Sequence, residues 1–176
     1  MTVDPILVSQ VKRDEGGPFL TAYPDPLSPL AKWALQHTEA WWRGPVALSG
    51  APWTDGYGNT HGVSRGTVIT LAEAEEDIVQ NLQIACALVA SALPWAPAQL
   101  SPPRLRVLQN MMFNLGWDDP KTPAHEGLSG FTTFLGLVKA DDYQGAADDG
   151  LKTLWARQVG QRATRRMAQL ATGIDQ

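Results

Sequence analysis

The feature that most constrains the fold is a long helix-forming segment in the middle of the chain. Between residues 71 and 93, apolar side chains recur every three or four positions, at Leu71, Ala74, Ile78, Leu82, Ala85, Val89 and Ala92. This spacing is typical of one face of an α-helix. Thr70 and Glu73 form a capping-box pattern at its start. Because its second half is apolar almost all round, we expect this helix to run through the middle of the fold.

Other helices are predicted on both sides of this segment. A short helix over residues 5–14 begins with Asp4 as its cap and brings Glu15 to its C-terminal end. A second helix over 28–43 begins with Ser28 and ends at Gly44. Later patterns predict helices over 104–115, 131–139, 143–156 and 161–171.

The segment between Glu15 and Val63 is different in character. Its first part, residues 15–26, contains three prolines and cannot form one continuous helix. Residues 52–60, with the sequence PWTDGYGNT, predict a strand or hairpin, since Trp, Thr and Tyr favour strands and the glycines allow a turn. This order of elements predicts an α+β fold with strands confined to a small lobe, and ligands commonly bind between such lobes.

Charge and size narrow the class of protein. A chain of 176 residues fits one domain, and its formal charge of −4 argues against nucleic acid as the main partner. Basic residues nevertheless gather in the last quarter, at Lys152, Arg157, Arg162, Arg165 and Arg166. This cluster is either a solvated helix face or a surface that attracts an anionic polymer.

The single cysteine, Cys86, lies within an apolar helical stretch. An internal disulfide is therefore impossible, and we expect a buried, inert thiol and synthesis in a reducing compartment. The longest apolar stretch, 82–93, is too short to span a bilayer, and no signal peptide opens the chain. These features predict a soluble protein that does not export itself.

The chemistry that the residues allow is carboxylate chemistry. His37, His61 and His125 have no metal-ligand spacing, so we expect no metal and no other cofactor. Glu15 and Asp25 lie ten residues apart on glycine- and proline-rich backbone that can aim both at one point. Glycoside hydrolysis uses such a pair, one carboxyl donating a proton and the other acting as a carboxylate. Two solvated surface acids would give the same pattern.

Several motifs follow one another in a specific order. Glu15-Gly16 is followed by AYPDP at 22–26, PWTDGYGNT at 52–60 and GTVITLAEAE at 66–75. Later come QNMMFNLG at 109–116 and a closing segment that runs from Trp155 through QRATRR at 161–166 to Gly173. This ordered set covers nearly the whole chain and resembles the phage-type lysozymes, the endolysins of glycoside hydrolase family 24.

The resemblance implies a lysozyme-like fold of two lobes joined by a long central helix. The small lobe would cover about residues 13–69 with an insertion at 27–51, and the helical lobe about 70–176 plus the N-terminal helix. It also implies hydrolysis of the β-1,4 bond between N-acetylmuramic acid and N-acetylglucosamine in peptidoglycan. The protein would be a monomeric endolysin that stays in the host cytoplasm until a holin opens the membrane, with neither nucleic acid nor a membrane span involved.

Site residues are implied by the same resemblance. Glu15 would be the general acid, Asp25 the second carboxylate, and Thr54 the hydroxyl that helps hold the attacking water. Such a water implies inversion, with carboxyl groups roughly 6.5 to 9.5 Å apart. The implied substrate-binding residues are Phe113, Asn114 and Arg162, the last of which aligns with a basic residue that pairs with the catalytic glutamate. Helix packing or an exposed basic position would explain these three equally well.

The sequence departs from the family pattern at four places. The spacing from Glu15 to Asp25 is one residue longer than usual, and Asn59 replaces a frequent histidine. Asp55 stands where an isoleucine is common, so it is a rival for the second carboxylate. If Thr54 faces the cleft, Asp55 should face away, because neighbours in a strand point to opposite faces.

The fourth departure is the insertion at 27–51, which carries Trp33, Trp41 and Trp42. These rings either form an extra wall that grips the glycan or pack to hold an added helix. Two other functions also stay open. A lytic transglycosylase would cut the same bond without needing Thr54 to hold a water. A non-catalytic peptidoglycan-binding or virion protein would not need Glu15, Asp25 and Thr54 together.

Overall fold

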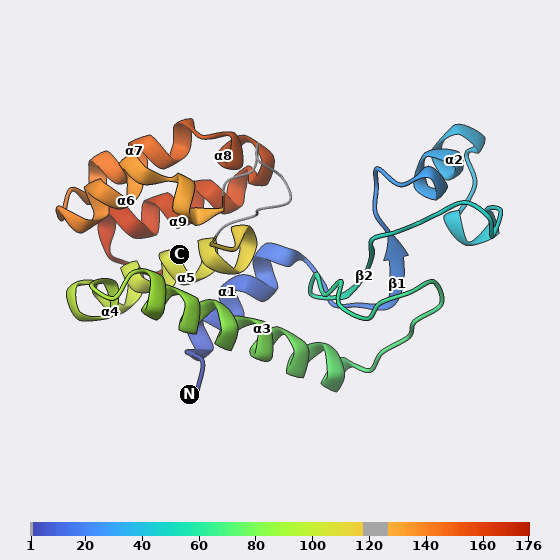
Figure 1. The fold of residues 1–176 in the computed structure, drawn as a ribbon, viewed down its shortest axis with the longest axis horizontal. Helices are drawn as coiled ribbons and strands as arrows, with labels where there is room; N and C mark the ends of the chain where they lie inside the picture. Colours follow the sequence, from blue (N-terminus) through green and yellow to red (C-terminus); the bar gives the residue numbers. More distant parts are fainter. Residues whose placement is uncertain (1, 118–126) are drawn as a thin grey trace. The chain divides into compact units, whose positions relative to one another are not determined.

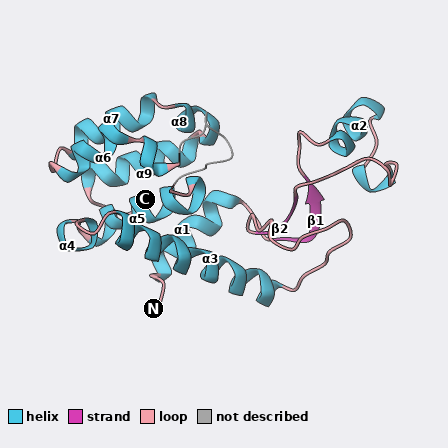
Figure 2. Ribbon diagram, viewed as in Figure 1, coloured by secondary structure: helices cyan, strands magenta, loops and turns pink. Residues whose placement is uncertain are grey.

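The computed structural model describes residues 2–117 and 127–176 of the chain (Figure 1). His125 lies outside these residues. Among these residues helices dominate, and the two short strands belong to the first third of the chain (Figure 2). The elements in order are α1 (Pro5–Glu15), β1 (Phe19–Pro24), α2 (Pro29–His37), η1 (Trp41–Arg43), β2 (Trp53–Gly56), α3 (Leu71–Ala92), α4 (Ala96–Gln99), α5 (Pro102–Leu115), η2 (Leu128–Gly130), α6 (Thr132–Lys139), α7 (Tyr143–Lys152), α8 (Leu154–Val159) and α9 (Gln161–Thr172).

The chain divides into two compact units. One comprises Lys12–Gln80 and contains both strands. The other comprises Met1–Val11 and Asn81–Gln176, and its described elements are all helices. The chain passes from one unit to the other within α1 and again within α3. This mixture of helices and a small antiparallel sheet is the α+β, lysozyme-like architecture that was expected.

The two strands pair antiparallel. Tyr23 lies opposite Thr54 and Pro24 opposite Trp53, with an irregularity between Phe19 and Tyr23. Strand β1 was not predicted, because prolines crowd this stretch. They flank the strand instead of interrupting it, and a proline at a strand end forgoes no essential ladder hydrogen bond. The other edge of β1 is joined by a later segment, where the Ile69 N–H donates to the Leu20 carbonyl at 2.9 Å.

The insertion at 27–51 packs against this sheet. Its core consists of the buried Ala22, Leu30 and Trp53, with Trp41, Leu48 and Val63 packed against them. The predicted helix over 28–43 is too long, since α2 ends at His37. Thr38 takes a left-handed conformation (φ 52°), which lets the Glu39 N–H donate to the Ala34 carbonyl at 3.0 Å and closes the helix. Trp41 therefore belongs to η1 and not to the face of α2.

The central helix α3 begins as predicted. The Thr70 N–H donates to Glu73 Oε2 at 2.7 Å, and the Glu73 N–H donates to Thr70 Oγ1 at 3.2 Å, which is a closed capping box. The expectation that its second half is surrounded by other parts of the fold is wrong. Leu82, Ala85 and Val89 are buried, but Ile84 is 59% exposed and Leu88 is 38% exposed. The helix is therefore buried along one face only, despite its apolar composition.

The helical unit has one large core that residues of α3 and α5 to α9 share. Its fully buried members include Val89, Val107, Leu108, Met111, Phe134, Val138 and Leu170. Helices α7 and α9 approach closely at Gly150, where there is no room for a side chain. A Cβ on Gly150 would lie 2.4 Å from Met167 Sδ. The predicted helix over 143–156 is two helices, since Thr153 ends α7 and its Oγ1 accepts from the Ala156 N–H at 3.1 Å to start α8.

The arginines of α9 do not form an exposed basic face, contrary to expectation. Arg166 is fully buried and donates to Gln169 Oε1 at 2.8 Å and to the Gln176 carbonyl at 3.0 Å. Arg162 is 5% exposed. Arg104 on α5 donates to the Leu170 carbonyl at 2.9 Å, near the C-terminus of α9, where a cation also interacts favourably with the helix dipole. These cations hold the end of the chain inside the helical unit.

Candidate active site

Glu15 is the last residue of α1, and Gly16 ends the helix with φ of 70°. Its carboxylate lies beside the turn that follows β2, since a Cβ on Gly58 would be 3.3 Å from Glu15 Oε2. The loop after Glu15 presses on the same turn, because a Cβ on Gly17 would be 2.5 Å from the Gly56 carbonyl oxygen. Two glycines thus allow the end of α1 and the β2 turn to meet around a half-buried glutamate.

Tyr23 and Thr54 meet next to this carboxylate. They are directly opposed in the sheet, and their side-chain hydroxyls are hydrogen-bonded to each other. Burial raises the pKa of Tyr23 above its ordinary value of 10.0, and the Glu15 carboxylate adds to the rise, while the Thr54 hydroxyl lowers it. The glutamate is therefore near enough to act on the phenol by charge. Side chains from α1, β1 and β2 gather in one place.

Asp25 follows β1 and continues its pairing with the second strand. Its N–H donates to the Pro52 carbonyl at 3.0 Å, and its Oδ1 accepts from the Leu27 N–H at 2.7 Å, which fixes the carboxylate in a turn. Asp25 comes directly after the strand that carries Tyr23, and its backbone is held at the start of β2, the strand that carries Thr54.

Asp55 has a different environment. It is 1% exposed, and its Oδ1 accepts from Asn59 Nδ2 at 3.0 Å. The backbones of the same two residues exchange hydrogen bonds of 2.9 and 3.0 Å, which close the turn after β2. The pKa of Asp77 on α3 is raised by burial and then by the charge of Asp55. Asp55 is thus a buried residue that organises a turn and faces the first part of α3.

The family comparison decides the identity of this fold. The family model described as phage lysozyme matches residues 36–169, which is well over half of the chain. The chain belongs to the phage lysozyme family. The search of curated proteins found no significant match to this chain. Family membership makes the protein a lysozyme-like glycoside hydrolase that acts on peptidoglycan. The matched range includes Thr54 but begins after Glu15 and Asp25.

The three substrate-binding residues predicted for this phage lysozyme all lie in the helical unit. Phe113 is half-buried and packs against the main core. Asn114 is exposed, and its Oδ1 accepts from the Trp155 indole N–H at 2.7 Å. Arg162 is buried and donates through Nε to Asn110 Oδ1 at 3.1 Å. Each has a local structural partner, and a contact of any of them with the glycan stays a prediction.

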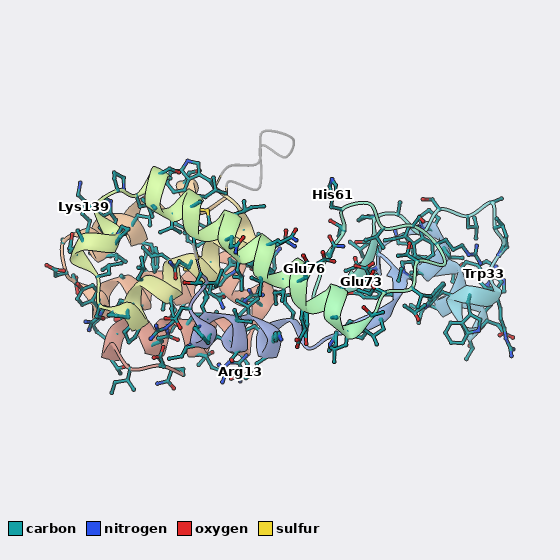
Figure 3. All side chains as sticks on the ribbon, turned by 90° about the horizontal axis from the view of Figure 1, so that it is seen from below. Arg13, Trp33, His61, Glu73, Glu76 and Lys139 are labelled. Carbon is teal, nitrogen blue, oxygen red and sulfur yellow. The ribbon has the colours of Figure 1, made fainter. Side chains whose placement is uncertain are left out.

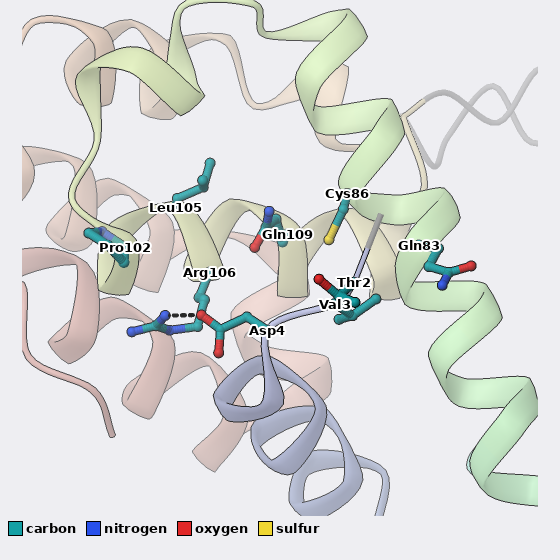
Figure 4. Close-up of a pocket in the computed structure, with 9 residues that line it drawn as sticks. All are labelled: Thr2, Val3, Asp4, Gln83, Cys86, Pro102, Leu105, Arg106 and Gln109. Carbon is teal, nitrogen blue, oxygen red and sulfur yellow. Dashed lines mark hydrogen bonds and ion pairs between the residues drawn. The ribbon is translucent and has the colours of Figure 1, made fainter.

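The lysozyme's helical unit also has a pocket (Figure 4), lined by the N-terminal segment, α3 and α5. Cys86 points toward it and is half-buried instead of fully buried as expected. Burial, followed by the nearby Asp4 carboxylate, raises the pKa of its thiol, so the thiol stays protonated. Arg106 at the same pocket forms ion pairs with Asp4 and Asp175. This pocket does not include Glu15, Asp25 or Thr54.

The residues that the structure describes are 2–117 and 127–176. Within these ranges, no group of three or more His, Cys, Asp or Glu side chains could hold a metal ion. In the same ranges, no helix has the length and apolarity needed to cross a membrane. Sequence reasoning did not assign roles to Tyr23 or Gly58. The signal for Tyr23 was its position two residues before Asp25, which in a strand gives both residues the same face.

Proposed function

We propose that this protein is an endolysin, which hydrolyses the β-1,4 bond between N-acetylmuramic acid and N-acetylglucosamine and so lyses the host cell. The observation that supports this proposal best is the position of Glu15. Its half-buried carboxylate lies against Gly58 and within electrostatic reach of Tyr23, which is bonded to Thr54. A half-buried carboxyl group held at a fixed place in a site can act as a general acid.

The reaction follows from these groups. Protonated Glu15 gives its proton to the glycosidic oxygen as the bond from that oxygen to the anomeric carbon breaks. A water held by the Thr54 hydroxyl adds to the anomeric carbon from the opposite face, and its proton passes to Asp25. The product sugar has inverted configuration, which requires carboxyl groups roughly 6.5 to 9.5 Å apart. Phe113, Asn114 and Arg162 would be the residues that bind the glycan.

Asp25 is the better candidate for the second carboxylate than Asp55. Asp25 Oδ1 accepts from the Leu27 N–H, and a carboxylate has a second oxygen that can accept a proton from water. Asp55 is 1% exposed and bonded to Asn59. A base must reach the proton that it takes, within about 2.6–3.2 Å or through one water. A buried side chain that organises a turn meets this condition poorly.

The cellular part of the proposal concerns access to the wall. The enzyme would accumulate in the host cytoplasm as a monomer and meet its substrate, the peptidoglycan glycan strand, once a holin opens the membrane. Size-exclusion chromatography with light scattering tests the monomer. Expression in a bacterium with and without a co-expressed holin tests the access, since lysis without a holin would contradict it.

The central experiment compares three variants that each remove one charge with little change in shape. Glu15→Gln and Asp25→Asn should abolish the clearing of bacterial cells stripped of their outer membrane, while Asp55→Asn serves as the matched control and should keep most activity at temperatures below its unfolding. Thermal unfolding of each variant separates lost chemistry from lost folding. Full activity of Glu15→Gln would overturn the proposal. Loss of activity in a folded Asp55→Asn, with Asp25→Asn active, would exchange the roles of the two aspartates.

Product analysis tests the reaction type. Hydrolysis leaves reducing N-acetylmuramic acid ends, whereas a lytic transglycosylase leaves 1,6-anhydro ends that are lighter by one water. Mass spectrometry of released muropeptides distinguishes them, and NMR of fresh product reports whether the anomeric configuration is inverted. The Thr54 hydroxyl, held by Tyr23, favours hydrolysis, because only hydrolysis needs a bound water. A protein that binds peptidoglycan and releases no fragments would be the non-catalytic alternative.

A further inference from the structure

Tyr23 is part of the candidate site but has no role in the reaction described above. It lies directly opposite Thr54 in the antiparallel pair. Directly opposed residues have Cβ atoms about 4.5–5.5 Å apart on one face of the sheet, so their side chains interact. Here the interaction is a hydrogen bond between the two hydroxyls. The partner of Tyr23 is thus the very hydroxyl that the proposed function assigns to the attacking water.

The Thr54 hydroxyl needs a partner to have a defined direction. A threonine hydroxyl has one donor hydrogen and two acceptor lone pairs, and its hydrogen rotates to suit its surroundings. A hydrogen bond to Tyr23 uses one of these positions and selects the χ1 rotamer that reaches the phenol. The remaining positions then point in fixed directions, which is the requirement for holding a water against a sugar.

Tyr23 is itself well anchored. Its ring meets the Phe19 ring edge-on, with centroids 5.0 Å apart and an interplanar angle of 65°. The residue is half-buried, and Pro24 beside it is buried in the pairing with Trp53. Its raised pKa keeps the phenol neutral throughout the pH range in which carboxylates do acid–base chemistry. It therefore brings a hydroxyl, and no charge, to the neighbourhood of Glu15.

We propose that Tyr23 is a positioning residue that holds the Thr54 hydroxyl in the rotamer that binds the attacking water. This role rests on the proposed hydrolysis. Tyr23 acts through Thr54 and does not touch the reacting atoms. Losing its hydroxyl should therefore slow the chemical step and leave the binding of the glycan unchanged.

The test begins with Tyr23→Phe, which keeps the ring and its contact with Phe19 and removes only the hydroxyl. We expect kcat on a soluble chitooligosaccharide or muropeptide substrate to fall about tenfold, the effect of one hydrogen bond, with KM changed less than twofold. Tyr143→Phe is the matched control, since it removes a hydroxyl bonded to Asp141 in the helical unit and should leave kcat unchanged. An unchanged kcat in Tyr23→Phe overturns the inference.

Thr54 variants show whether Tyr23 acts through this residue. In a Thr54→Val background, Tyr23→Phe should cost nothing further, because no hydroxyl remains to be positioned. In a Thr54→Ser background it should cost more than in the wild type, since serine lacks the branched Cβ that restricts χ1. Equal losses in all three backgrounds would show that Tyr23 acts independently of Thr54 and would overturn the inference.

The outcomes also separate this inference from the proposed function. An inactive Glu15→Gln with an impaired Thr54→Val and an unaffected Tyr23→Phe overturns only the role of Tyr23. A fully active Thr54→Val overturns the water-holding step and the role of Tyr23 together. The pH–rate profile gives a further readout, because a neutral residue that acts on Thr54 should leave both limbs where they are. If either limb of the profile shifted in Tyr23→Phe, Tyr23 would be influencing the groups that titrate. That result would overturn the positioning role.

Discussion

Gly58 and Glu15 are close neighbours, with Glu15 Oε2 3.3 Å from the place where a Cβ on Gly58 would stand. Gly58 has φ of 94°, and its N–H donates to the Asp55 carbonyl at 3.0 Å to close the turn after β2. The turn that Asp55 organises therefore forms the wall against which the proposed general acid rests. The backbone conformation favours a glycine at this position, and a side chain here would crowd the carboxylate.

This contact predicts that Gly58→Ala reduces activity more than its cost in stability explains. A left-handed conformation costs a non-glycine residue about 1–2 kcal/mol, and the new methyl group would push the Glu15 carboxylate aside. Displacement of a catalytic group by a fraction of an ångström to 1 Å lowers rates by about ten- to a hundredfold. Cell-clearing rates and urea unfolding measure the two effects.

Gly62→Ala is the matched control for this prediction. Gly62 also has a positive φ, 72°, but a Cβ there would have no atom within 4 Å. It should therefore lose a similar amount of stability and keep its activity. If both variants lost activity equally, strain in the loop would account for the result and the contact with Glu15 would not matter.

The sequence was sufficient to predict those structural features that depend on residues close together in the chain. The capping box of Thr70 and Glu73 and the Ser28 cap of α2 involve residues close in sequence, so their patterns were sufficient. The end of α2 could not be foreseen, because it needs Thr38 in a left-handed conformation that threonine rarely adopts.

The candidate site shows the same limit. The position of Glu15 at the end of α1 followed from local helix signals. The contacts of Tyr23 with Thr54, and of Glu15 with Gly58, depend on the register of two strands separated by the 27–51 insertion. Strand register is fixed by burial and by the whole chain path, which a single sequence does not display. The buried arginines of α9 were missed for a similar reason, since their partners include the Gln176 carbonyl.

The tryptophans of the insertion lead to a second prediction. Trp41 makes edge-on contacts with Trp53, at 5.4 Å between centroids, and with Trp42, at 5.6 Å. Trp41 packs against the core of the small unit, whereas Trp42 is 65% exposed. Trp41→Ala should thus lower the free energy of unfolding by about 2–4 kcal/mol, and Trp42→Ala by about 0.5 kcal/mol or less. Equal losses in urea unfolding would contradict this assignment.

The same pair tests the glycan-wall hypothesis at Trp42, which is exposed whereas Trp33 and Trp41 are half-buried. An exposed indole can stack on a sugar ring, so Trp42→Ala should lower binding to insoluble peptidoglycan at an unchanged melting temperature. Sedimentation of an inactive Glu15→Gln protein with cell walls, with and without Trp42→Ala, measures the binding. Equal binding of the two proteins would assign Trp42 no part in gripping the glycan.

The capping box makes stability depend on pH. The pKa of Glu73 lies below its ordinary value of 4.5, first because the Thr70 N–H donates to its carboxylate and then because the Thr70 hydroxyl does. A lowered pKa in the folded state means that the stabilisation is complete above the unfolded-state pKa and is lost as pH falls through the folded-state pKa. Wild type and Glu73→Gln should thus differ most above about pH 4.5 and converge in more acidic solution.

Melting temperatures from pH 2 to pH 7 would test this behaviour. Glu76→Gln is the control, because Glu76 lies on the same early part of α3 (Figure 3) but its Oε1 accepts from Gln80 Nε2 and not from the helix N-terminus. At pH 7 it should lower the melting temperature less than Glu73→Gln does, because it removes no helix cap. Thr70→Ala should cost about 1 kcal/mol at pH 7. A pH-independent gap between wild type and Glu73→Gln would count against a charged cap.

Arg106 leads to the last prediction. It is 5% exposed and forms ion pairs with Asp4 and, at 2.5 Å, with Asp175. Burial alone would lower the pKa of Arg106, but the hydrogen bonds and charges of the two carboxylates raise it. Arg106→Met would leave both carboxylates without this partner in a partly buried site. Since the aspartates are 38% and 32% exposed, the loss should be about 2–3 kcal/mol, below that of a fully buried pair.

The matched control for Arg106→Met is Arg43→Met. Arg43 pairs with Glu39 at 3.2 Å on the surface, with side-chain exposures of 69% and 44%. Exposed pairs of this kind contribute about 0.2–1 kcal/mol, so this variant should be nearly as stable as wild type in urea. Because Asp175 also accepts from Gln10 and Gln169, Asp175→Asn combined with Arg106→Met should cost less than the sum of the single changes. Two outcomes would contradict this prediction: additive losses in the double variant, or equal losses from the two arginine variants. Either would mean that apolar packing, and not the ion pairs of Arg106, mainly stabilises this part of the helical unit.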